Sequence, residues 1–236
     1  MRREFIARPE RTVTRQVIVY ADRIEVATNA LVPAPKPHEA VVRSVVSGIC
    51  GSDTHAAHGQ HPFIPIPYHP GHEAVEVVEA VGSDVSGLSV GQRVTVEPDL
   101  PCRNCKMCAT GQQNLCEQLQ FFGCGWEQGG VADYFTVAAD RLCVIPDDLD
   151  DTAAVLIEPL STPVHAVRLA SNGRLDGVAG KSVAVLGAGT IGLLLLSVLN
   201  ASGVGRWSSP TCWRASAHGR PRSAQTSQSM PARTTS

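Results

Sequence analysis

Short hydrophobic runs alternate with polar and turn-forming residues over roughly the first 144 positions of the chain. Four runs are rich in valine and are bounded by Gly, Pro, Asn or Asp, at residues 16–20, 40–46, 73–81 and 92–97. Glu76 and Glu79 interrupt the valines of the third run, which predicts a strand with one face toward solvent. This spacing predicts a mainly β domain, a barrel or a sandwich, rather than alternating strands and helices.

The pattern changes near Pro146. Residues 150–169 are rich in Ala, Leu and Val, and Pro159 and Pro163 within this stretch predict a broken helix. An apolar run at 181–186 is typical of a buried strand, and a glycine turn and a helical run over 193–199 follow it. A strand, a tight turn and a helix in this order predict the first βα unit of an α/β domain.

The last 31 residues have a different composition. Residues 206–236 contain no Val, Leu, Ile, Asp, Glu or Lys, but seven Ser, four Thr and five Arg. A Ser/Arg-rich disordered tail is one interpretation. Our preferred hypothesis is a slip of the reading frame near Arg206. Residues 207–214, encoded as TGG TCG TCG CCG ACG TGC TGG CGC and read one base earlier after a G, become Val-Val-Val-Ala-Asp-Val-Leu-Ala, a buried-strand pattern.

Composition and charge restrict the class of protein. The chain has 236 residues, of which 43% are hydrophobic and 18% charged, and this balance excludes a disordered polar chain. The net charge of -2 gives no reason to expect nucleic acid or an anionic membrane as a partner. The charge is uneven, because all 22 acidic residues lie before residue 177 while the remainder carries six basic residues.

Two segments of the sequence are candidates for a secretory signal and for a membrane span, and neither fits. Residues 1–14 are charged and lack the apolar segment of a secretory signal. Residues 182–205 carry no charge and are long enough to span a bilayer, but five glycines interrupt them. We therefore expect a soluble cytoplasmic protein.

Four cysteines on a short loop form the strongest metal-binding pattern in the sequence: Cys102, Cys105, Cys108 and Cys116. Their spacing lets four thiolates converge on one tetrahedral zinc ion, and a closed four-cysteine site is structural. Two disulfides are disfavoured by a cytoplasmic setting, and the wide last gap fits neither common iron–sulfur spacing. We predict a structural zinc lobe at about residues 98–120.

A second donor set is spread over two motifs. The stretch 48–55 reads Gly-Ile-Cys-Gly-Ser-Asp-Thr-His and contains Cys50, and residues 70–73 read Pro-Gly-His-Glu and contain His72 and Glu73. One sulfur, one nitrogen and one oxygen are the mixed ligands of an open catalytic zinc. By chemistry alone His69 is an alternative ligand. Glu158 lies in an apolar run, where a buried carboxylate needs a partner such as a metal or a metal-bound water.

The glycines of the α/β segment match a dinucleotide-binding fingerprint. Gly187, Gly189 and Gly192 follow the predicted strand and precede the predicted helix. Such glycines permit a tight turn and close backbone approach, while the helix N-terminus faces the pyrophosphate. The fingerprint also requires an acidic residue about 20 positions later. None is present, but the aspartate restored by the corrected frame falls near position 211.

Taken in order, these motifs resemble the zinc-dependent medium-chain dehydrogenase/reductases of the alcohol dehydrogenase superfamily. The resemblance rests on GICGSDTH, PGHE, the four-cysteine lobe, EPLS and GAGTIG, and it covers roughly residues 17–204. Within the superfamily the chain is most similar to the polyol (sorbitol) and threonine dehydrogenase branch. The implied fold is a mainly β GroES-like catalytic domain at 1–158, the connecting helix and first βα unit of a Rossmann domain at 159–205, and a low-complexity tail at 206–236.

The resemblance also implies site residues and chemistry. It makes Cys50, His72 and Glu73 the ligands of a catalytic zinc, with Glu158 as an alternative ligand or an outer partner. It places Ser52 and His55 in a proton relay and the three fingerprint glycines against NAD or NADP. A small secondary alcohol or polyol would be the substrate, and the intact family forms homo-oligomers.

Two hypotheses of different class follow. In the first, the chain is a zinc- and NAD(P)-dependent alcohol or polyol dehydrogenase by descent. In the second, it is a truncated, non-catalytic zinc-binding fragment, because a Rossmann domain has six strands and only one is evident here. The substrate, the choice between NAD and NADP and the oligomeric state do not follow from the sequence.

Overall fold

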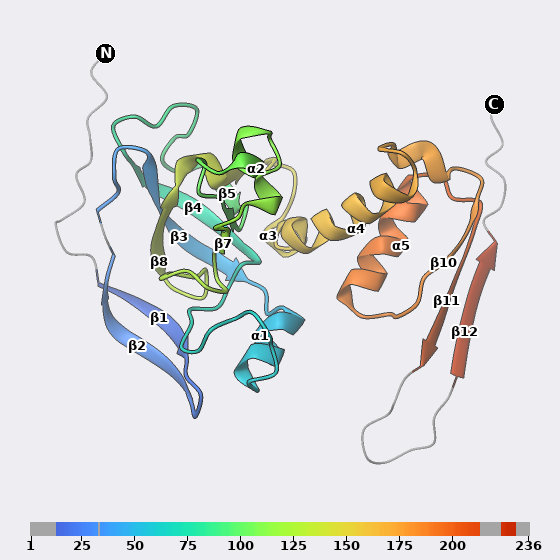
Figure 1. Ribbon diagram of the computed structural model, residues 1–236, viewed down its shortest axis with the longest axis horizontal. Helices are drawn as coiled ribbons and strands as arrows, with labels where there is room; N and C mark the ends of the chain where they lie inside the picture. The colour runs from blue at the N-terminus through green and yellow to red at the C-terminus, as the bar shows by residue number, and fades with distance from the viewer. Residues whose placement is uncertain (1–12, 33, 213–222, 230–236) are drawn as a thin grey trace. The chain divides into compact units, whose positions relative to one another are not determined.

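The computed structural model describes residues 13–32, 34–212 and 223–229, and the chain divides into two compact units, Met1–Glu158 and Pro159–Ser236. The first unit is mainly β, as the valine-rich runs predict (Figure 1). Its largest sheet has five antiparallel strands in the order β8-β3-β4-β5-β9. These strands are β3 (Glu39–Ser47), β4 (Ala74–Val81), β5 (Arg93–Val96), β8 (Tyr134–Ala138) and β9 (Leu142–Val144).

A hairpin and a short helix accompany this sheet. Strands β1 (Val13–Val19) and β2 (Ile24–Leu31) pair with each other, and β1 also bridges to Tyr68 and Ala132 outside the named strands. The helix α1 (Gly51–Ala57) begins four residues after β3 ends. The chain then returns along an irregular loop to β4, so that the residues before and after this excursion lie at the same end of the sheet.

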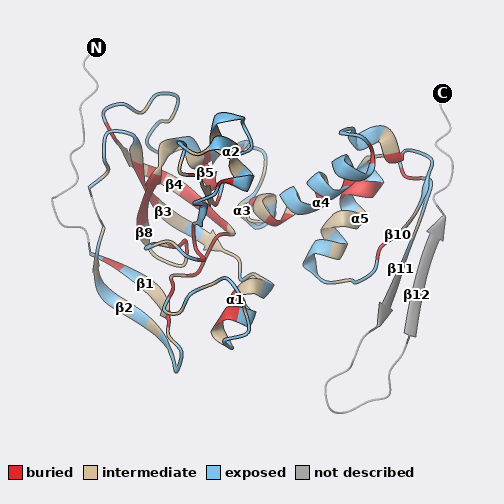
Figure 2. Ribbon diagram, viewed as in Figure 1, coloured by how far each residue is buried: buried red, intermediate tan, exposed pale blue. Residues whose placement is uncertain are grey.

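The core of the first unit lies on one face of the five-stranded sheet. Ala40, Val42, Val78 and Val94 are fully buried there and pack with Phe122 and Phe135. Figure 2 shows the buried residues concentrated along β3, β4 and β8. Burial of aliphatic and aromatic side chains at this density is the main favourable term for folding of the unit.

One expectation about β4 is wrong. The sequence predicts that Glu76 and Glu79 lie on a wet face, but Glu76 is completely buried, on the same strand face as Val78. Neither carboxyl oxygen of Glu76 has a hydrogen-bond partner among the described residues. Glu79 does meet the expectation of a polar environment, since it pairs with Arg43 at 2.8 Å. The alternation alone could not separate these two glutamates, because both faces of this strand are partly covered.

The segment between β5 and β8 carries the cysteine lobe. It contains β6 (Asp99–Leu100), α2 (Lys106–Ala109), the 3-10 turn η1 (Gln113–Leu115) and β7 (Gln120–Phe121). Strands β6 and β7 pair with each other and close the base of the lobe. Residues 139–141 form a second 3-10 turn, η2 (Ala139–Arg141), that leads into β9.

Helices connect the two units along the chain. The helical stretch is observed as α3 (Asp151–Ala154) and α4 (Ile157–Ala170), but the break lies at residues 155–156, and α4 continues through both Pro159 and Pro163, where the sequence predicts a break. Asp150 caps α3, because its carboxylate accepts a hydrogen bond from the backbone N–H of Ala153 at 2.9 Å. Pro163 lies inside α4 and is buried.

The second unit contains the predicted strand, turn and helix. After η3 (Leu175–Val178), the strand β10 (Ser182–Ala184) leads through the glycine turn into α5 (Thr190–Ala201) and then β11 (Arg206–Cys212). Strands β10 and β11 are parallel, and β12 (Ser223–Ser229) pairs antiparallel with β11. A small apolar cluster that includes Val167, Val198 and Leu199 holds α4 and α5 together.

The low-complexity tail is described only in part. Its first residues belong to β11 and a later stretch to β12, whereas 213–222 and 230–236 lie outside the described residues. The frame-slip hypothesis for this region stays a prediction. Among the residues that the structure describes, no helix combines the length and the apolar character needed to cross a membrane.

Candidate metal centres and the cofactor turn

Strand pairing brings the two motifs of the mixed donor set together. Ser47 at the end of β3 lies opposite Ala74 at the start of β4, and the N–H of Gly48 donates to the carbonyl of Glu73 at 2.6 Å. The residues just beyond both strand ends are therefore neighbours. A side chain at position 48 would place its Cβ 2.5 Å from a Glu73 carboxyl oxygen, so glycine at this position leaves room for the Glu73 carboxylate as it stands.

The structure places one donor atom each of Cys50, His72 and Glu73 within 4.8 Å of one another. Cys50 is the N-cap residue of α1, and His72 is buried. Thiolate, imidazole and carboxylate are the donors that zinc prefers in sites with an open position. The residues present therefore fit a catalytic zinc ion by their chemistry and their proximity.

The pKa values of Cys50 and His72 are both shifted by their mutual contact. A hydrogen bond with His72 lowers the pKa of Cys50, against the effect of burial. Burial alone would lower the pKa of His72, but its contacts with Cys124 and Cys50 outweigh that effect and raise the pKa to about 11. The two shifts have a common cause, because the charged forms of the imidazole and the neighbouring thiol stabilise each other.

The two alternative ligands occupy different positions. Glu158, on α4, is outside the three-residue donor group, but its carboxyl group interacts electrostatically with His72 and Glu73. Burial is the main cause that raises the pKa of Glu158. His69 also lies outside the group, and burial lowers its pKa. The geometry therefore favours Glu73 over Glu158 and His69 as the third donor.

A cavity of about 500 Å³ adjoins the donor group. Ser52 and His72 line it, together with Phe63 and Cys124. His55, the second predicted relay residue, lies one helical turn after Ser52, is exposed and does not line this cavity. The hydrogen bonds of the described residues include none between Ser52 and His55.

Sequence reasoning missed two polar residues beside His72. Asp53 and Cys124 are both buried, and with His72 they form a second group whose donor atoms lie within 4.8 Å. Asp53 could have been suspected, since it stands three residues after Cys50 on the same helix turn. Cys124 carried no signal, because it lies 52 residues from His72 and outside any repeated spacing.

The four-cysteine lobe forms as the spacing predicts. The sulfur atoms of Cys102, Cys105, Cys108 and Cys116 lie within 4.8 Å of one another. Cys105 Sγ is 3.5 Å from Cys108 Sγ and 3.9 Å from Cys116 Sγ. The backbone N–H groups of Cys102 and Gln118 donate to Cys116 Sγ at 3.2 and 3.4 Å.

Two thiols of the lobe respond oppositely to their surroundings. Hydrogen bonds from the backbone of Cys108 and Glu117 lower the pKa of Cys105 to about 6. Desolvation and contact with Cys105 raise the pKa of Cys108 to about 12. Several thiolates at this distance repel one another unless a cation lies between them. The lobe thus fits a tetrahedral structural zinc.

The glycine turn has the geometry that the fingerprint requires. Gly187 adopts a φ of +105°, and Gly189 is the N-cap residue of α5. A Cβ at Gly192 would lie 2.1 Å from the carbonyl oxygen of Gly187, whereas a Cβ at Gly187 or Gly189 meets nothing within 4 Å. The third glycine therefore serves the packing of the turn, and the first two leave open space for a ligand.

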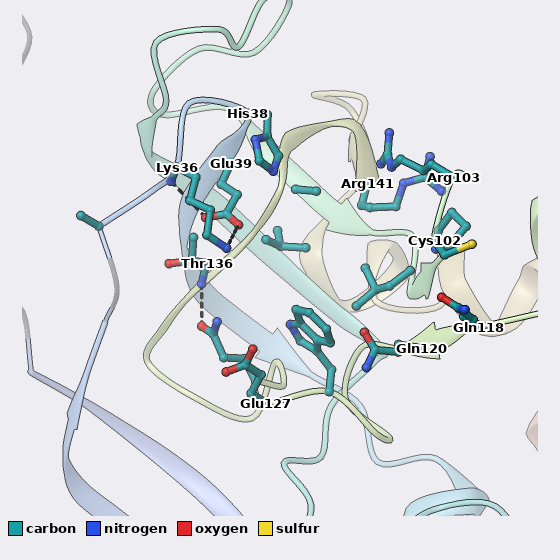
Figure 3. A pocket seen from close by; sticks show the side chains of 17 residues that line it. Lys36, His38, Glu39, Cys102, Arg103, Gln118, Gln120, Glu127, Thr136 and Arg141 are labelled. Atoms are coloured by element: carbon teal, nitrogen blue, oxygen red, sulfur yellow. Dashed lines mark hydrogen bonds and ion pairs between the residues drawn. The ribbon is translucent and has the colours of Figure 1, made fainter. Parts of the chain in front are cut away.

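A second cavity of about 570 Å³ lies between the cysteine lobe and β8 (Figure 3). Three of its cationic side chains are already paired with carboxylates. Lys36 contacts Glu39 at 3.0 Å, Arg103 pairs with Asp140, and Arg141 contacts Glu97 at 3.1 Å. Each of these three cations is therefore already engaged by a carboxylate.

Comparison with known proteins matches the first unit to one domain family. Residues 36–147 match the family described as the alcohol dehydrogenase GroES-like domain. D-xylulose reductase A of Aspergillus oryzae is 38% identical over 169 residues, which are 70% of this chain and 46% of the relative. L-galactonate-5-dehydrogenase of Escherichia coli strain K12 is 36% identical over 173 residues, 73% of this chain and 48% of the relative.

A solved structure extends the likeness to the three-dimensional level. A protein of Sinorhizobium meliloti 1021, assigned to the zinc-binding dehydrogenases and bound to NADP, matches with a TM-score of 0.77 and 33% identity. The match covers 86% of this chain and 57% of that one. The chain spans about half the length of the curated relatives it matches.

Proposed function

Because the chain belongs to the zinc-dependent medium-chain dehydrogenase/reductases, in their polyol dehydrogenase branch, we propose that it acts as a zinc- and NAD(P)-dependent oxidoreductase whose metal centre lies in the first unit. The substrate would be a small secondary alcohol or polyol, in keeping with the names of its relatives. The observation that carries the proposal is the convergence of Cys50, His72 and Glu73 beside a cavity lined by Ser52.

The residues of this site have separate tasks in the proposed reaction. Cys50, His72 and Glu73 would hold zinc, with the carboxyl of Glu158 nearby as an outer partner. When bound, zinc favours the alkoxide form of a coordinated hydroxyl, and the nicotinamide ring accepts the hydride. The side chains that line the cavity would orient the substrate against the donor group.

Ser52 would handle the proton of the substrate hydroxyl. Its side chain lines the cavity together with His72, so its Oγ is available to a hydroxyl bound there. The exposed ring of His55, one helical turn further along α1, would pass the proton to solvent. Removal of this proton through Ser52 and His55 would prepare the carbinol carbon for loss of its hydride.

The second unit supplies the proposed cofactor contact. Open space at Gly187 and Gly189 admits a pyrophosphate close to the backbone, at the N-terminus of the 12-residue helix α5. The close packing of Gly192 against the carbonyl group of Gly187 stabilises the turn. Either NAD or NADP is compatible with these glycines.

A second candidate function is zinc binding without turnover. It is favoured by the exposed apolar surface of the second unit, where Leu186 is 83% and Leu193 55% exposed. A βα unit with this much uncovered apolar surface is poorly suited to hold a dinucleotide in a fixed position.

Metal analysis and a cofactor-reduction assay on the purified 236-residue chain test both candidates. We expect two zinc ions per chain, one in Cys50→Ala, and reduction of NAD or NADP with a polyol panel that Cys50→Ala abolishes. Two zinc ions without any reduction would support the zinc-binding candidate. A single zinc in the unaltered chain, or full activity in Cys50→Ala, would overturn the assignment of the catalytic centre.

A further inference from the structure

The imidazole of His72 lies between two thiols. Cys50, on one side, belongs to the proposed zinc-binding group. On the other side, Cys124 Sγ lies 3.3 Å from His72 Nδ1, and both of these residues are buried. A sulfur this close to a ring nitrogen is within hydrogen-bonding distance, so Nδ1 has a protein partner.

The backbone holds Cys124 firmly in this place. Gly123 adopts a φ of +73°, and a Cβ there would lie 2.5 Å from the carbonyl carbon of Gly71 and 2.7 Å from the backbone nitrogen of His72. The N–H groups of Cys124 and Gly125 both donate to the carbonyl of Phe121, which closes the turn. The turn after β7 is therefore seated directly on the backbone that carries His72.

A second contact from the same turn fixes the plane of the imidazole. The ring of Phe121 meets the ring of His72 edge to face, with centroids 5.6 Å apart and an interplanar angle of 73°. Phe121 thus fixes the orientation of the ring plane, and Cys124 fixes the position of the ring edge that carries Nδ1. A side chain held in this way loses little freedom when it binds a metal.

The chemistry of imidazole gives these contacts a consequence. A neutral imidazole carries a proton on one nitrogen and a lone pair on the other, and only the lone pair can bind a metal. The partner of the first nitrogen decides which tautomer is present. An acceptor at Nδ1 therefore directs the lone pair of the other nitrogen toward the metal.

We propose that Cys124 is a positioning residue for His72, its sulfur accepting the Nδ1–H and so presenting the opposite nitrogen to the zinc held with Cys50 and Glu73. The inference rests on the proposed zinc-dependent function. It gives a role in the same centre to a thiol that is not itself a zinc ligand.

Asp53, His72 and Cys124 could instead be read as a second metal site, since their donor atoms lie within 4.8 Å. The carboxylate of Asp53 is already engaged, however. It accepts a hydrogen bond from the backbone N–H of Cys50 at 3.0 Å and one from the hydroxyl of Tyr68 at 3.5 Å. Asp53 thus serves the cap of α1, and the remaining sulfur and nitrogen form a hydrogen-bonded pair.

The test measures zinc affinity in the full chain by competition with a chromophoric chelator. The variants are Cys124→Ala and Cys124→Ser, and the control is Cys143→Ser, which removes an exposed thiol from β9. We expect Cys124→Ala to keep two zinc ions but to weaken the catalytic one about 10–100-fold. Cys124→Ser, which keeps an acceptor, should recover most of the loss, and Cys143→Ser should match the unaltered chain.

Cobalt substitution separates positioning from ligation. The sulfur-to-cobalt absorption of the catalytic site should fall in Cys50→Ala and persist in Cys124→Ala. Its loss in Cys124→Ala would make Cys124 a ligand and overturn the inference. If the unaltered chain binds two zinc ions and Cys124→Ala binds them with unchanged affinity, the positioning role of Cys124 is refuted, while the proposed catalytic centre stands. A single zinc in the unaltered chain would instead refute the catalytic centre, and the inference with it.

Discussion

Glu76 on β4 lies directly opposite Val94 on β5, and both side chains are completely buried. The carboxyl group has no hydrogen-bond partner among the described residues, and burial raises its pKa well above the ordinary value. A buried carboxylate without a partner is costly in its charged form, so burial favours the protonated form of Glu76 in the folded protein. This residue therefore links the stability of the first unit to pH.

The sign of that linkage follows from the raised pKa of Glu76. Between the unfolded pKa of about 4.5 and the folded pKa, the folded state binds a proton that the unfolded state has released. Stability contributed by Glu76 is thus present below pH 4.5 and is lost as pH rises, by about 1.4 kcal/mol per pH unit at most.

Replacement of Glu76 by glutamine should remove this slope. We expect the difference in unfolding free energy between Glu76→Gln and the unaltered chain to grow in favour of the variant from pH 5 to 8, measured by urea denaturation. Glu76→Val should be more stable still at neutral pH, because it continues the apolar face. Glu79→Gln, which breaks the contact with Arg43, serves as control and should not stabilise the chain. A pH-independent difference for Glu76→Gln would contradict the prediction.

The two candidate carboxylate ligands should respond differently to substitution. Glu73→Gln removes a donor from the group that includes Cys50 and His72, whereas Glu158→Gln changes a carboxyl outside that group. We expect Glu73→Gln to lower catalytic zinc affinity more strongly, by at least tenfold relative to Glu158→Gln, in a chelator competition. The reverse order would make Glu158 the third ligand.

Loss of one thiol from the cysteine lobe should remove one zinc ion and loosen the lobe. Cys105→Ser leaves three sulfurs, and the remaining thiols cannot close a four-coordinate site. We expect the zinc content to fall by one and proteolytic cleavage within 98–120 to become faster. Cleavage elsewhere in the first unit, with the lobe still protected, would show that the zinc does not stabilise this segment.

Two glycines of the cofactor turn form a matched pair. Gly192→Ala should destabilise the second unit, because its Cβ would meet the carbonyl oxygen of Gly187 at 2.1 Å. Gly189→Ala has free space and a negative φ of -76°, so the turn should tolerate it while losing room for a pyrophosphate. Hydrogen exchange of α5 should accelerate only in Gly192→Ala. Equal exchange in both variants would argue against the packing role of Gly192.

Features with a local spacing could be predicted from the sequence alone. The four cysteines converge within one short loop, and the glycine turn joins a strand directly to its helix, so neighbouring residues suffice to define both. The valine-rich runs likewise predict the strands β3, β4 and β5 within a few residues of their observed bounds. In each case the residues that define the feature are close along the chain, so it can form without bringing distant segments together.

Features that depend on strand pairing required the tertiary structure. Cys50 and His72 become neighbours because β3 and β4 pair at their ends. Their donor chemistry and the resemblance to a family pointed to them, but no spacing along the chain did. Cys124 reaches His72 from 52 residues away through a turn seated on Gly71. The burial of Glu76 was decided by which face of the sheet the core covers. Hydrophobic alternation specifies the faces of a strand, but only the packing of distant segments decides which of them loses contact with water.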